Sequence, residues 1–430
     1  MGNYIGIGFG VALLVFLAFQ FGLFLVSGIK RTRHEASQRA LAREQLELQI
    51  RIAKAQLAEI EGARFAWTGY RKLVVYRKQQ VCDGVFAFYM RAHDGRPLSP
   101  FKPGQFLTFR LNILGCAKPI VRCYSLSSSP ADTSNYRVTI KFEPPPPKKP
   151  DAPPGLASGF FCNKVREGYI LDAKAPAGKF FLDQDKMTPV VLLAGGVGIT
   201  PMLSMAHAIK ERDTGREVWF IVGVRSGQEL IHSDELAALA EQPNMQVRIC
   251  FSKPGESDEQ GRDYHHEGRV TPDLMKEILP SKNFEFYLCG NGSFMNSLHE
   301  ALEIWGVPEE KIHFEAFGPA TVKRKAETNF IKKQTAMLTK QEAEKQAPKV
   351  TLNRSSATHD WGGLTTSLLE FIQEKGGEVE SGCCAGSCGS CVVAIKSGEI
   401  EYIQDPDSPP EEGTCLTCIS IPKTDVVLDA

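Results

Sequence analysis

The longest apolar run of the chain lies near its N-terminus. Ile5–Ile29 has 25 residues, with Gln20 as the only strongly polar one, and as a helix it would span about 37 Å, enough for a hydrocarbon core ~30 Å thick. Lys30 follows directly, and no Lys or Arg precedes the run. The positive-inside rule predicts a single-pass anchor within residues 1–32, with the N-terminus outside and all later domains cytoplasmic at a cell inner membrane. Membrane lipid is then an expected partner. A cleaved signal peptide is disfavoured, because the run is too long and has no basic start.

A segment of strong helix formers follows this run. Residues 33–63 are expected to form a helical stalk, because Arg33–Glu61 is rich in Ala, Leu, Glu, Gln, Arg and Lys and contains no Pro or Gly. Within it, successive apolar residues are alternately four and three positions apart, at Leu46, Ile50, Ala53, Leu57 and Ile60. Only about two heptads are present, which is short for a coiled coil. The stalk is expected to pack on its own domain, and a homodimer seam stays open.

Short alternating segments separated by Gly and Pro turns fill residues 64–186. Lys72–Tyr76, Phe106–Leu111 and Tyr136–Phe142 alternate apolar and polar positions, which predicts an antiparallel β-barrel. Pro144–Pro154 has seven Pro among eleven residues, and this composition predicts an extended insertion loop.

The pattern changes to strand, glycine turn and helix in residues 187–320. Pro189–Ala194 is a buried-strand run, Gly195–Pro201 is glycine-rich, and Met202–Arg212 has a helical pattern. Val218–Gly223 predicts the next strand and Asp234 the start of another helix. A glycine turn between a strand and a helix lets the backbone approach a phosphate at the helix N-terminus. The region therefore predicts an α/β Rossmann-like domain with a phosphate-binding loop.

Charge divides the remaining chain into a linker and an acidic domain. Residues 321–349 hold 8 basic and 3 acidic residues, and residues 350–430 hold 4 basic and 13 acidic residues, a net −9. The linker is expected to be extended, and a helix is expected at Thr366–Glu374. An acidic surface suits steering toward a basic face of a partner protein. The sequence has no interleaved basic and aromatic residues of the kind that would indicate nucleic-acid binding.

The acidic domain contains a cysteine pattern with metal-binding spacing. C-x4-C-x2-C followed by a distant fourth Cys is the plant-type spacing for a [2Fe–2S] cluster, with the candidate ligands Cys383, Cys388, Cys391 and Cys418. Cys415 competes with Cys418 for the fourth place; the sequence around Cys418 resembles plant-type ferredoxins and favours it. Cys384 is read as a non-ligand. A zinc site is the alternative, but zinc favours paired CxxC motifs.

The barrel region contains a flavin-type motif. Arg122-Cys123-Tyr124-Ser125-Leu126-Ser127 resembles the RxYS motif of the ferredoxin–NADP reductase superfamily. The resemblance implies that Arg122 binds the flavin phosphate, that Tyr124 stacks on the isoalloxazine, and that Ser125 faces the ring near its reacting N5, with Leu126 in the same binding stretch.

Two further stretches resemble the same superfamily. Val138–Glu143 and Gly155–Ser158 resemble its second flavin-binding stretch, which implies cofactor contacts from Lys141, Gly155, Ala157 and Ser158. The glycine-rich turn resembles the GGxGxTP variant of the nicotinamide-dinucleotide loop, which implies contacts from Gly195, Gly196, Gly198, Thr200 and Pro201.

The end of the nicotinamide region carries the remaining candidate residues. Phe286–Asn291 resembles the family's nicotinamide-side turn, which implies that Cys289 and Gly290 lie beside the hydride-transfer site. Glu315 and Phe317 match the terminal E-x-F-G near the flavin edge. Ser125, Cys289 and Glu315 are the candidate catalytic residues.

The order of modules resembles oxygenase-type reductases with a C-terminal ferredoxin, such as the phthalate dioxygenase, phenylacetyl-CoA epoxidase and hybrid-cluster-protein reductases. The implied fold is multidomain: an FAD-binding antiparallel β-barrel (64–186), a Rossmann-like NAD(P)H-binding domain (187–320) and a β-grasp ferredoxin (350–430), preceded by one transmembrane helix. The implied cofactors are FAD, with FMN as the alternative, a [2Fe–2S] cluster, and NADH, although Arg225 leaves NADPH open.

The resemblance implies an NAD(P)H-dependent oxidoreductase that supplies electrons to a redox protein. With the predicted anchor, the expected acceptor is a membrane oxygenase, hydroxylase or desaturase. The alternatives are a component of an NADH:quinone oxidoreductase and a redox-sensing electron-transfer protein. A structural scaffold would require that neither flavin nor cluster be bound.

Overall fold

The computed structural model describes most of the chain after residue 66. The described ranges are 67–116, 119–145, 153–316, 348–362, 367–377, 379–384, 388–403 and 409–430, with isolated positions elsewhere. The chain divides into two compact units, Met1–Arg64 and Phe65–Ala430. In the first unit, the isolated described positions at 42, 43, 45, 46, 49 and 50 are helical. The predicted linker before Pro348, the centre of the Pro-rich insertion and Phe317 lie outside the described residues.

The prediction of a membrane location is wrong on the evidence of the described helices. No helix in the described part of the chain is long and apolar enough to cross a membrane. The longest of them, α3 (Ile199–Arg212), has 14 residues and is about 21 Å long, against a hydrocarbon core of ~30 Å. The apolar run Ile5–Ile29, on which the prediction depended, lies outside the described residues apart from Gln20.

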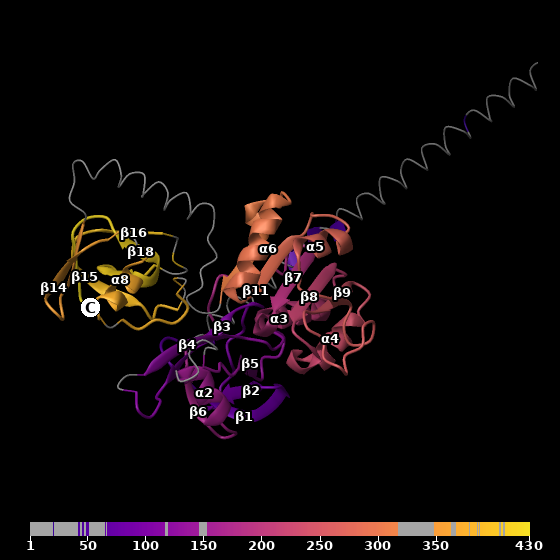
Figure 1. The fold of residues 1–430 in the computed structure, drawn as a ribbon, viewed down its shortest axis with the longest axis horizontal. Helices are drawn as coiled ribbons and strands as arrows, with labels where there is room; N and C mark the ends of the chain where they lie inside the picture. Colours follow the sequence, from indigo (N-terminus) through magenta and orange to yellow (C-terminus); the bar gives the residue numbers. More distant parts are fainter. Residues whose placement is uncertain are drawn as a thin grey trace, which may run out of the picture. The chain divides into compact units, whose positions relative to one another are not determined.

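The second unit begins with a six-stranded antiparallel sheet (Figure 1). Its strands follow the spatial order β4-β3-β6-β1-β2-β5. The bounds are β1 (Arg71–Cys82), β2 (Val85–Ala92), β3 (Phe106–Leu111), β4 (Ile120–Ser125), β5 (Tyr136–Lys141) and β6 (Ile170–Ala173). A bridge between Leu126 and Val138 joins the two ends of this order, so the sheet closes on itself as the predicted barrel.

Aromatic packing fills the barrel around one short helix, α2 (Leu156–Asn163). The ring of Phe161 is fully buried and packs edge-on against Phe88 and Phe109, with ring centroids 5.3 Å away in both cases. Aromatic pairs in this geometry stabilise a core beyond the area they bury. Alternate residues of β1 and β2 supply the rest of this core, as the period-two pattern requires.

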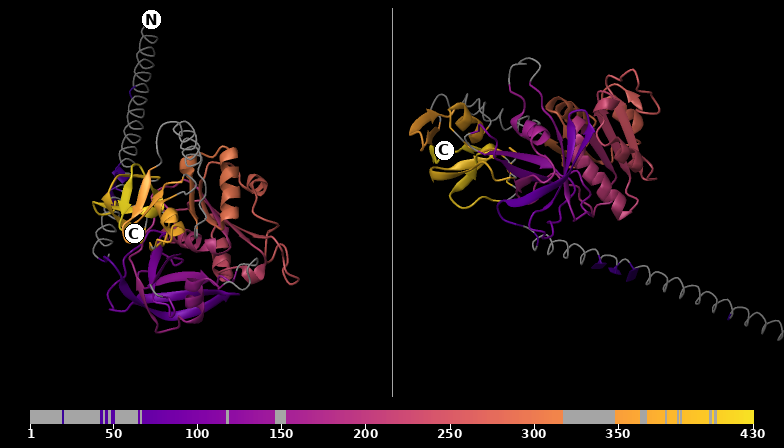
Figure 2. Two further views of the ribbon diagram at one scale, coloured as in Figure 1. Left: turned by 60° about the vertical axis from the view of Figure 1, so that its left-hand side comes forward. Right: turned by 90° about the horizontal axis from the view of Figure 1, so that it is seen from below.

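A parallel six-stranded sheet follows, in the order β10-β9-β8-β7-β11-β12. Its strands are β7 (Val190–Gly195), β8 (Val218–Val224), β9 (Met245–Phe251), β10 (His266–Glu267), β11 (Glu285–Gly290) and β12 (Ile312–Ala316). The strand order reverses between β7 and β11, the kind of switch point where such sheets bind ligands. Figure 2 shows this sheet in magenta to orange and the barrel in purple.

Helices cover both faces of the parallel sheet, which explains why its central strands are apolar throughout. Helix α3 and helix α4 (Ser233–Ala240) pack into one hydrophobic cluster with residues such as Leu192 and Phe220. Helix α5 (Pro272–Ile278) and helix α6 (Gly292–Ile304) pack into the other with residues such as Leu193 and Phe286.

The C-terminal part is a small mixed sheet with one described helix. Five strands follow the order β14-β13-β19-β15-β17, and β16 pairs with β18. The bounds are β13 (Lys349–Leu352), β14 (Ala357–Asp360), β15 (Val392–Ser397), β16 (Ile400–Tyr402), β17 (Thr414–Leu416), β18 (Ser420–Pro422) and β19 (Val426–Leu428). Helix α8 (Leu368–Glu374) begins later than expected, because the Ser367 side chain caps it by accepting from the Glu370 N–H.

Candidate functional site

The four predicted cluster ligands lie in two pairs. The Sγ atoms of Cys391 and Cys418 are 3.1 Å apart. Cys383 and Cys388 form the other pair, in which each thiol accepts from the backbone N–H of its partner at 3.3 Å. A two-iron cluster with four thiolate ligands needs two thiolates at each iron. The donor chemistry and this pairing therefore fit a [2Fe–2S] group. Within the described ranges, no group of three or more His, Cys, Asp or Glu residues is arranged to hold a single metal ion.

The structure separates the two candidates for the fourth ligand. Cys415 lies on β17 and is fully buried in the apolar core of the small sheet, with neighbours such as Val393. Cys418 lies in the short turn after this strand and packs with Cys391 and Ile419. This placement supports Cys418.

Glycine is required at two positions of the cysteine loop. A Cβ on Gly382 would lie 2.8 Å from Cys388 Sγ, and a Cβ on Gly386 would lie 2.4 Å from the Ile419 side chain. Gly386 also has a φ of 74°, in the left-handed region that side chains disfavour. Both glycines let the loop close tightly around its thiols.

The flavin-type motif lies on β4 at the edge of the barrel core. Arg122 is exposed, whereas Ser125 and Leu126 are buried. The Tyr124 ring packs edge-on against Phe161 at 5.2 Å, and burial raises the pKa of its phenol above the usual value. This four-residue stretch fits a phosphate-bearing flavin, because it combines an exposed cation, an aromatic ring packed against the core and a buried hydroxyl.

The second flavin-type stretch joins β5 to the start of α2. Ser158 Oγ donates to the Gly155 carbonyl and accepts from the Glu143 N–H, both at 3.2 Å. A Cβ on Gly155 would lie 2.7 Å from Ser158 Oγ, so only glycine fits this turn. Ala157 is buried beneath it. The Lys141 Nζ lies 3.7 Å from a Glu229 carboxylate oxygen of the parallel-sheet domain.

The glycine-rich loop joins β7 to α3 at the switch point of the parallel sheet. A Cβ on Gly198 would lie 2.1 Å from the Cys289 carbonyl oxygen, so the loop touches β11 only because this residue is glycine. Gly196 has a φ of 57°. Thr200 Oγ1 donates to the Val197 carbonyl at 3.1 Å, and Pro201 lies in the first turn of α3. The resulting helix N-terminus fits a pyrophosphate.

The three candidate catalytic residues meet where the barrel touches the parallel sheet. Cys289 and Glu315 are direct neighbours on β11 and β12, and Ser125 Oγ donates to Glu315 Oε2 at 3.1 Å. Burial raises the pKa of the Glu315 carboxyl to about 8, although the hydrogen bond from Ser125 opposes the shift. Burial and the nearby carboxyl also raise the pKa of the Cys289 thiol. Both groups therefore carry their protons at neutral pH.

One aromatic residue beside this corner was missed by the sequence reasoning. Phe294, in the first turn of α6, lies against both Gly195 and Gly290: added Cβ atoms would be 3.0 and 2.7 Å from its ring. Asn291 Oδ1 accepts from the Phe294 N–H at 3.0 Å and so caps the helix. The apolar pattern of α6 does not distinguish Phe294 from a core residue.

Contacts between the cysteine loop and the barrel were also not predicted. Lys174 Nζ, just after β6, donates to the Cys388 carbonyl at 3.0 Å. A Cβ on Gly382 would lie 3.5 Å from Cys123 Sγ, and Cys123 directly precedes Tyr124. The cluster loop therefore contacts the strand that carries the flavin-type motif.

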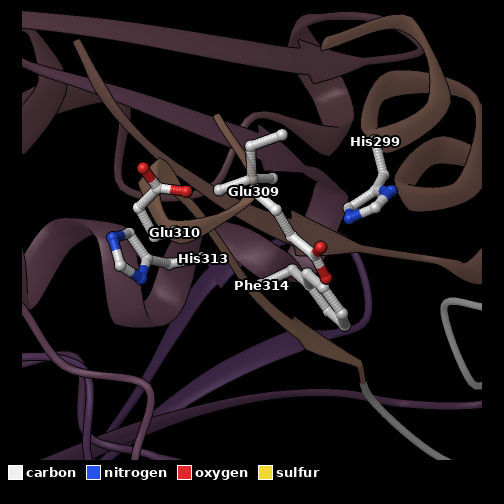
Figure 3. Close-up of a pocket in the computed structure, with 6 residues that line it drawn as sticks. His299, Glu309, Glu310, His313 and Phe314 are labelled. Atoms are coloured by element: carbon white, nitrogen blue, oxygen red, sulfur yellow. The ribbon is translucent and has the colours of Figure 1, made fainter. Parts of the chain in front are cut away.

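One surface pocket lies apart from these residues (Figure 3). It is lined by His299 of α6 and by residues of β12 and the turn before it: Glu309, Glu310, Ile312, His313 and Phe314. His313 Nε2 lies 2.7 Å from Glu285 Oε2, and its ring stacks on Tyr287. None of the predicted site residues lines this pocket.

Comparison with known proteins identifies two domain families in this chain. Residues 192–300 match the oxidoreductase NAD-binding domain family, and residues 350–423 match the 2Fe-2S iron-sulfur cluster binding domain family. The chain is 30% identical to the flavohem-like FAD/NAD-binding domain of nitric oxide dioxygenase from Vibrio cholerae O1 biovar El Tor; the match covers 58% of this chain and 100% of that one, with a TM-score of 0.52. This chain belongs to the ferredoxin–NADP reductase superfamily. Its residues 192–300 form an oxidoreductase NAD-binding domain.

Two other proteins show the extent of the similarity. A flavohemoprotein from Halalkalibacterium halodurans is 35% identical over 272 residues, which cover 63% of this chain and 65% of that protein. The chain thus spans less than two thirds of this relative. A phthalate dioxygenase reductase structure is 23% identical over 84% of this chain and 98% of its own, with a TM-score of 0.49. The two family matches support the predicted NADH and [2Fe–2S] cluster, and the similarity to an FAD/NAD-binding domain supports the predicted FAD.

Proposed function

We propose that this protein is an NADH-dependent reductase that delivers electrons, through FAD and a [2Fe–2S] cluster, to a separate redox protein such as an oxygenase, hydroxylase or desaturase. The observation that carries the proposal is the contact between the cluster loop and the barrel: Lys174, just after β6, donates to the Cys388 carbonyl, and Gly382 lies against Cys123 on β4. When bound, the flavin takes up a hydride and the cluster carries single electrons.

The chain's own residues first bind and orient the nucleotide. The turn before α3 offers backbone N–H groups to a pyrophosphate, and Gly198 lets the loop lie against the Cys289 carbonyl. Gly290 leaves the space between β7 and α6 that the Phe294 ring fills. These residues would hold the nucleotide near the corner where Cys289 neighbours Glu315 and Ser125 donates to Glu315.

Ser125 and Glu315 determine the charge at the corner where the barrel meets β11 and β12. Because the pKa of Glu315 is raised to about 8, its carboxyl holds a proton at neutral pH. The Ser125 hydroxyl and the Glu315 carboxyl, with Oγ and Oε2 3.1 Å apart, would thus hold their protons and keep this corner free of negative charge. Cys289 remains a neutral thiol for the same reason.

The acidic domain provides the exit for electrons. Its net charge of −9 over residues 350–430 favours encounter with a basic face of the acceptor, and salt should slow such an encounter. The charge does not specify the acceptor, so the oxygenase class is inferred from the order of modules.

Anaerobic visible spectroscopy tests the proposal. The purified chain should show flavin and iron–sulfur absorption, and both should bleach after NADH is added. Cys388→Ser should abolish reduction of cytochrome c but retain reduction of ferricyanide at the flavin. Cys116→Ser, a change outside the cysteine loop, should retain both activities. Retention of cytochrome c reduction by Cys388→Ser would disprove the electron path, and an absence of bleaching in the wild type would disprove the reductase function.

A further inference from the structure

A partly buried ion pair links the barrel to the nicotinamide domain. Arg137 on β5 donates hydrogen bonds from both of its terminal N–H groups to the carboxylate of Glu235 on α4, with Nη2 2.9 Å from Oε2. The Arg137 side chain is only 8% exposed. A bidentate pair of this kind is geometrically specific, and loss of one partner leaves the other charge buried without compensation.

Two histidines also contact the Glu235 carboxylate. His207 Nε2 on α3 lies 2.8 Å from Glu235 Oε2, and His232 Nδ1 at the start of α4 lies 2.9 Å from Oε1. With Arg137, the carboxylate therefore has partners from the barrel and from two helices of the nicotinamide domain. An isolated surface ion pair would be worth little, but this one belongs to a network.

The network continues toward the flavin-type motif through hydroxyl groups. His232 Nε2 lies 3.0 Å from Thr139 Oγ1, which lies 3.0 Å from Ser127 Oγ. Arg137 Nε also donates to Ser127 Oγ at 3.1 Å. Ser127 is two residues beyond Ser125. The network thus begins beside the flavin-type motif.

Its other end lies on the helix that begins at the dinucleotide loop. His207 lies on α3, seven residues after Thr200, and α3 starts directly after Gly198. Any shift of α3 relative to β5 must stretch the contacts to Glu235. The network is therefore placed to set the distance between the flavin-type motif and the nucleotide loop.

We propose that Arg137, Glu235, His207 and His232 form an interdomain clamp that holds the nicotinamide domain against the flavin barrel in the geometry for hydride transfer. Arg137 and Glu235 are then positioning residues for flavin reduction, and none of the four needs to contact the nucleotide. This inference rests on the proposed function.

Single-turnover flavin reduction by NADH tests the clamp. Glu235→Gln should lower the limiting rate of flavin reduction about 10- to 100-fold, since a misplacement of about 1 Å can cost about 10²-fold in rate. The dissociation constant for NADH and the flavin content should stay near those of the wild type, because the binding residues remain in place. A role in stability alone would lower the melting temperature without slowing reduction in the folded fraction.

Asp234→Asn is the matched control. Asp234 precedes Glu235 in the same turn of α4 but is exposed, so its removal changes the charge at the helix start without touching the clamp. This variant should reduce its flavin at the wild-type rate. Combined with Glu235→Gln, Arg137→Gln should add little further loss, since the two side chains act as one unit.

The possible outcomes separate the clamp from the proposed function. Absence of flavin reduction in the wild type would overturn the proposed function. Normal wild-type reduction with an equally fast Glu235→Gln would overturn the clamp alone. If Glu235→Gln does not fold, His207→Gln takes its place, because His207 is 21% exposed and contributes one contact. An unchanged rate in His207→Gln would then overturn the clamp.

Discussion

Ser125 Oγ donates a hydrogen bond to Glu315 Oε2 across 3.1 Å, although 190 positions separate the two residues in the chain. Ser125 ends β4 of the barrel, and Glu315 lies near the end of β12 in the parallel sheet. The bond thus joins the flavin-type motif to the nicotinamide domain at the corner where Cys289 also lies.

Glu315 should make the stability of the protein fall as the pH rises. Its pKa is about 8 in the folded chain, above the ordinary value of 4.5, so the folded state binds more protons than the unfolded state between these values. The stability linked to this proton is fully present below pH 4.5 and is lost as the pH rises through about 8. Glu315→Gln, which resembles the protonated form, should show a flatter dependence of melting temperature on pH between 4.5 and about 8. Glu277→Gln, an exposed change on α5, should retain the wild-type slope.

Lys174 should control electron transfer from the flavin to the cluster. Its ammonium group donates to the Cys388 carbonyl, and a hydrogen bond from a charged group is worth about 1.5–3 kcal/mol. Lys174→Met should slow cluster reduction about tenfold, which corresponds to about 1.4 kcal/mol. Stopped-flow absorbance would follow this step after NADH has reduced the flavin at an unchanged rate. Lys164→Met, an exposed change after α2, is the control; a slowing of equal size there would contradict the specific role of Lys174.

Gly198 should tolerate no side chain. An added Cβ would lie 2.1 Å from the Cys289 carbonyl oxygen, and overpacking of this kind costs about 1–3 kcal/mol. Gly198→Ala should lower the free energy of unfolding by that amount and weaken NADH binding, measured by chemical denaturation and by titration. In Gly159→Ala, on α2, the nearest atom would be 3.7 Å away, so this variant should bind NADH normally. Normal NADH affinity in Gly198→Ala would show that the loop can move aside.

Cys418 and Cys415 should differ sharply when each is replaced by Ser. Cys418 lies 3.1 Å from Cys391, whereas Cys415 is fully buried in an apolar core. Cys418→Ser should lose the iron–sulfur absorption and most of the bound iron. Cys415→Ser should retain both and lose only some thermal stability. The opposite result would make Cys415 the fourth ligand.

Local patterns were enough to predict much of the fold. Phe106–Leu111 was predicted as a strand and is β3, and the helix expected at Met202–Arg212 lies within α3. Period-two alternation and the turn from strand to helix arise from backbone geometry, so nearby residues reveal them. The Cys spacing likewise indicated a cluster-binding loop, since three of its ligands are close in sequence.

Local patterns failed where the outcome depended on context. The apolar run Ile5–Ile29 suggested a membrane location that the described helices do not support. Cys415 and Cys418 have the same chemistry and are three residues apart, so spacing alone left both open. Burial separated them, because one side chain points into the small-sheet core and the other lies beside Cys391.

The sequence by itself determined the modules, their order and the chemistry of their binding loops, because each depends on residues close together in the chain. Only the tertiary structure decided which distant groups meet. Arg137 and Glu235 are 98 positions apart, and Lys174 and Cys388 are 214 apart. Such pairs follow from the packing of whole domains, and that packing is set by complementary surfaces rather than by any local periodicity.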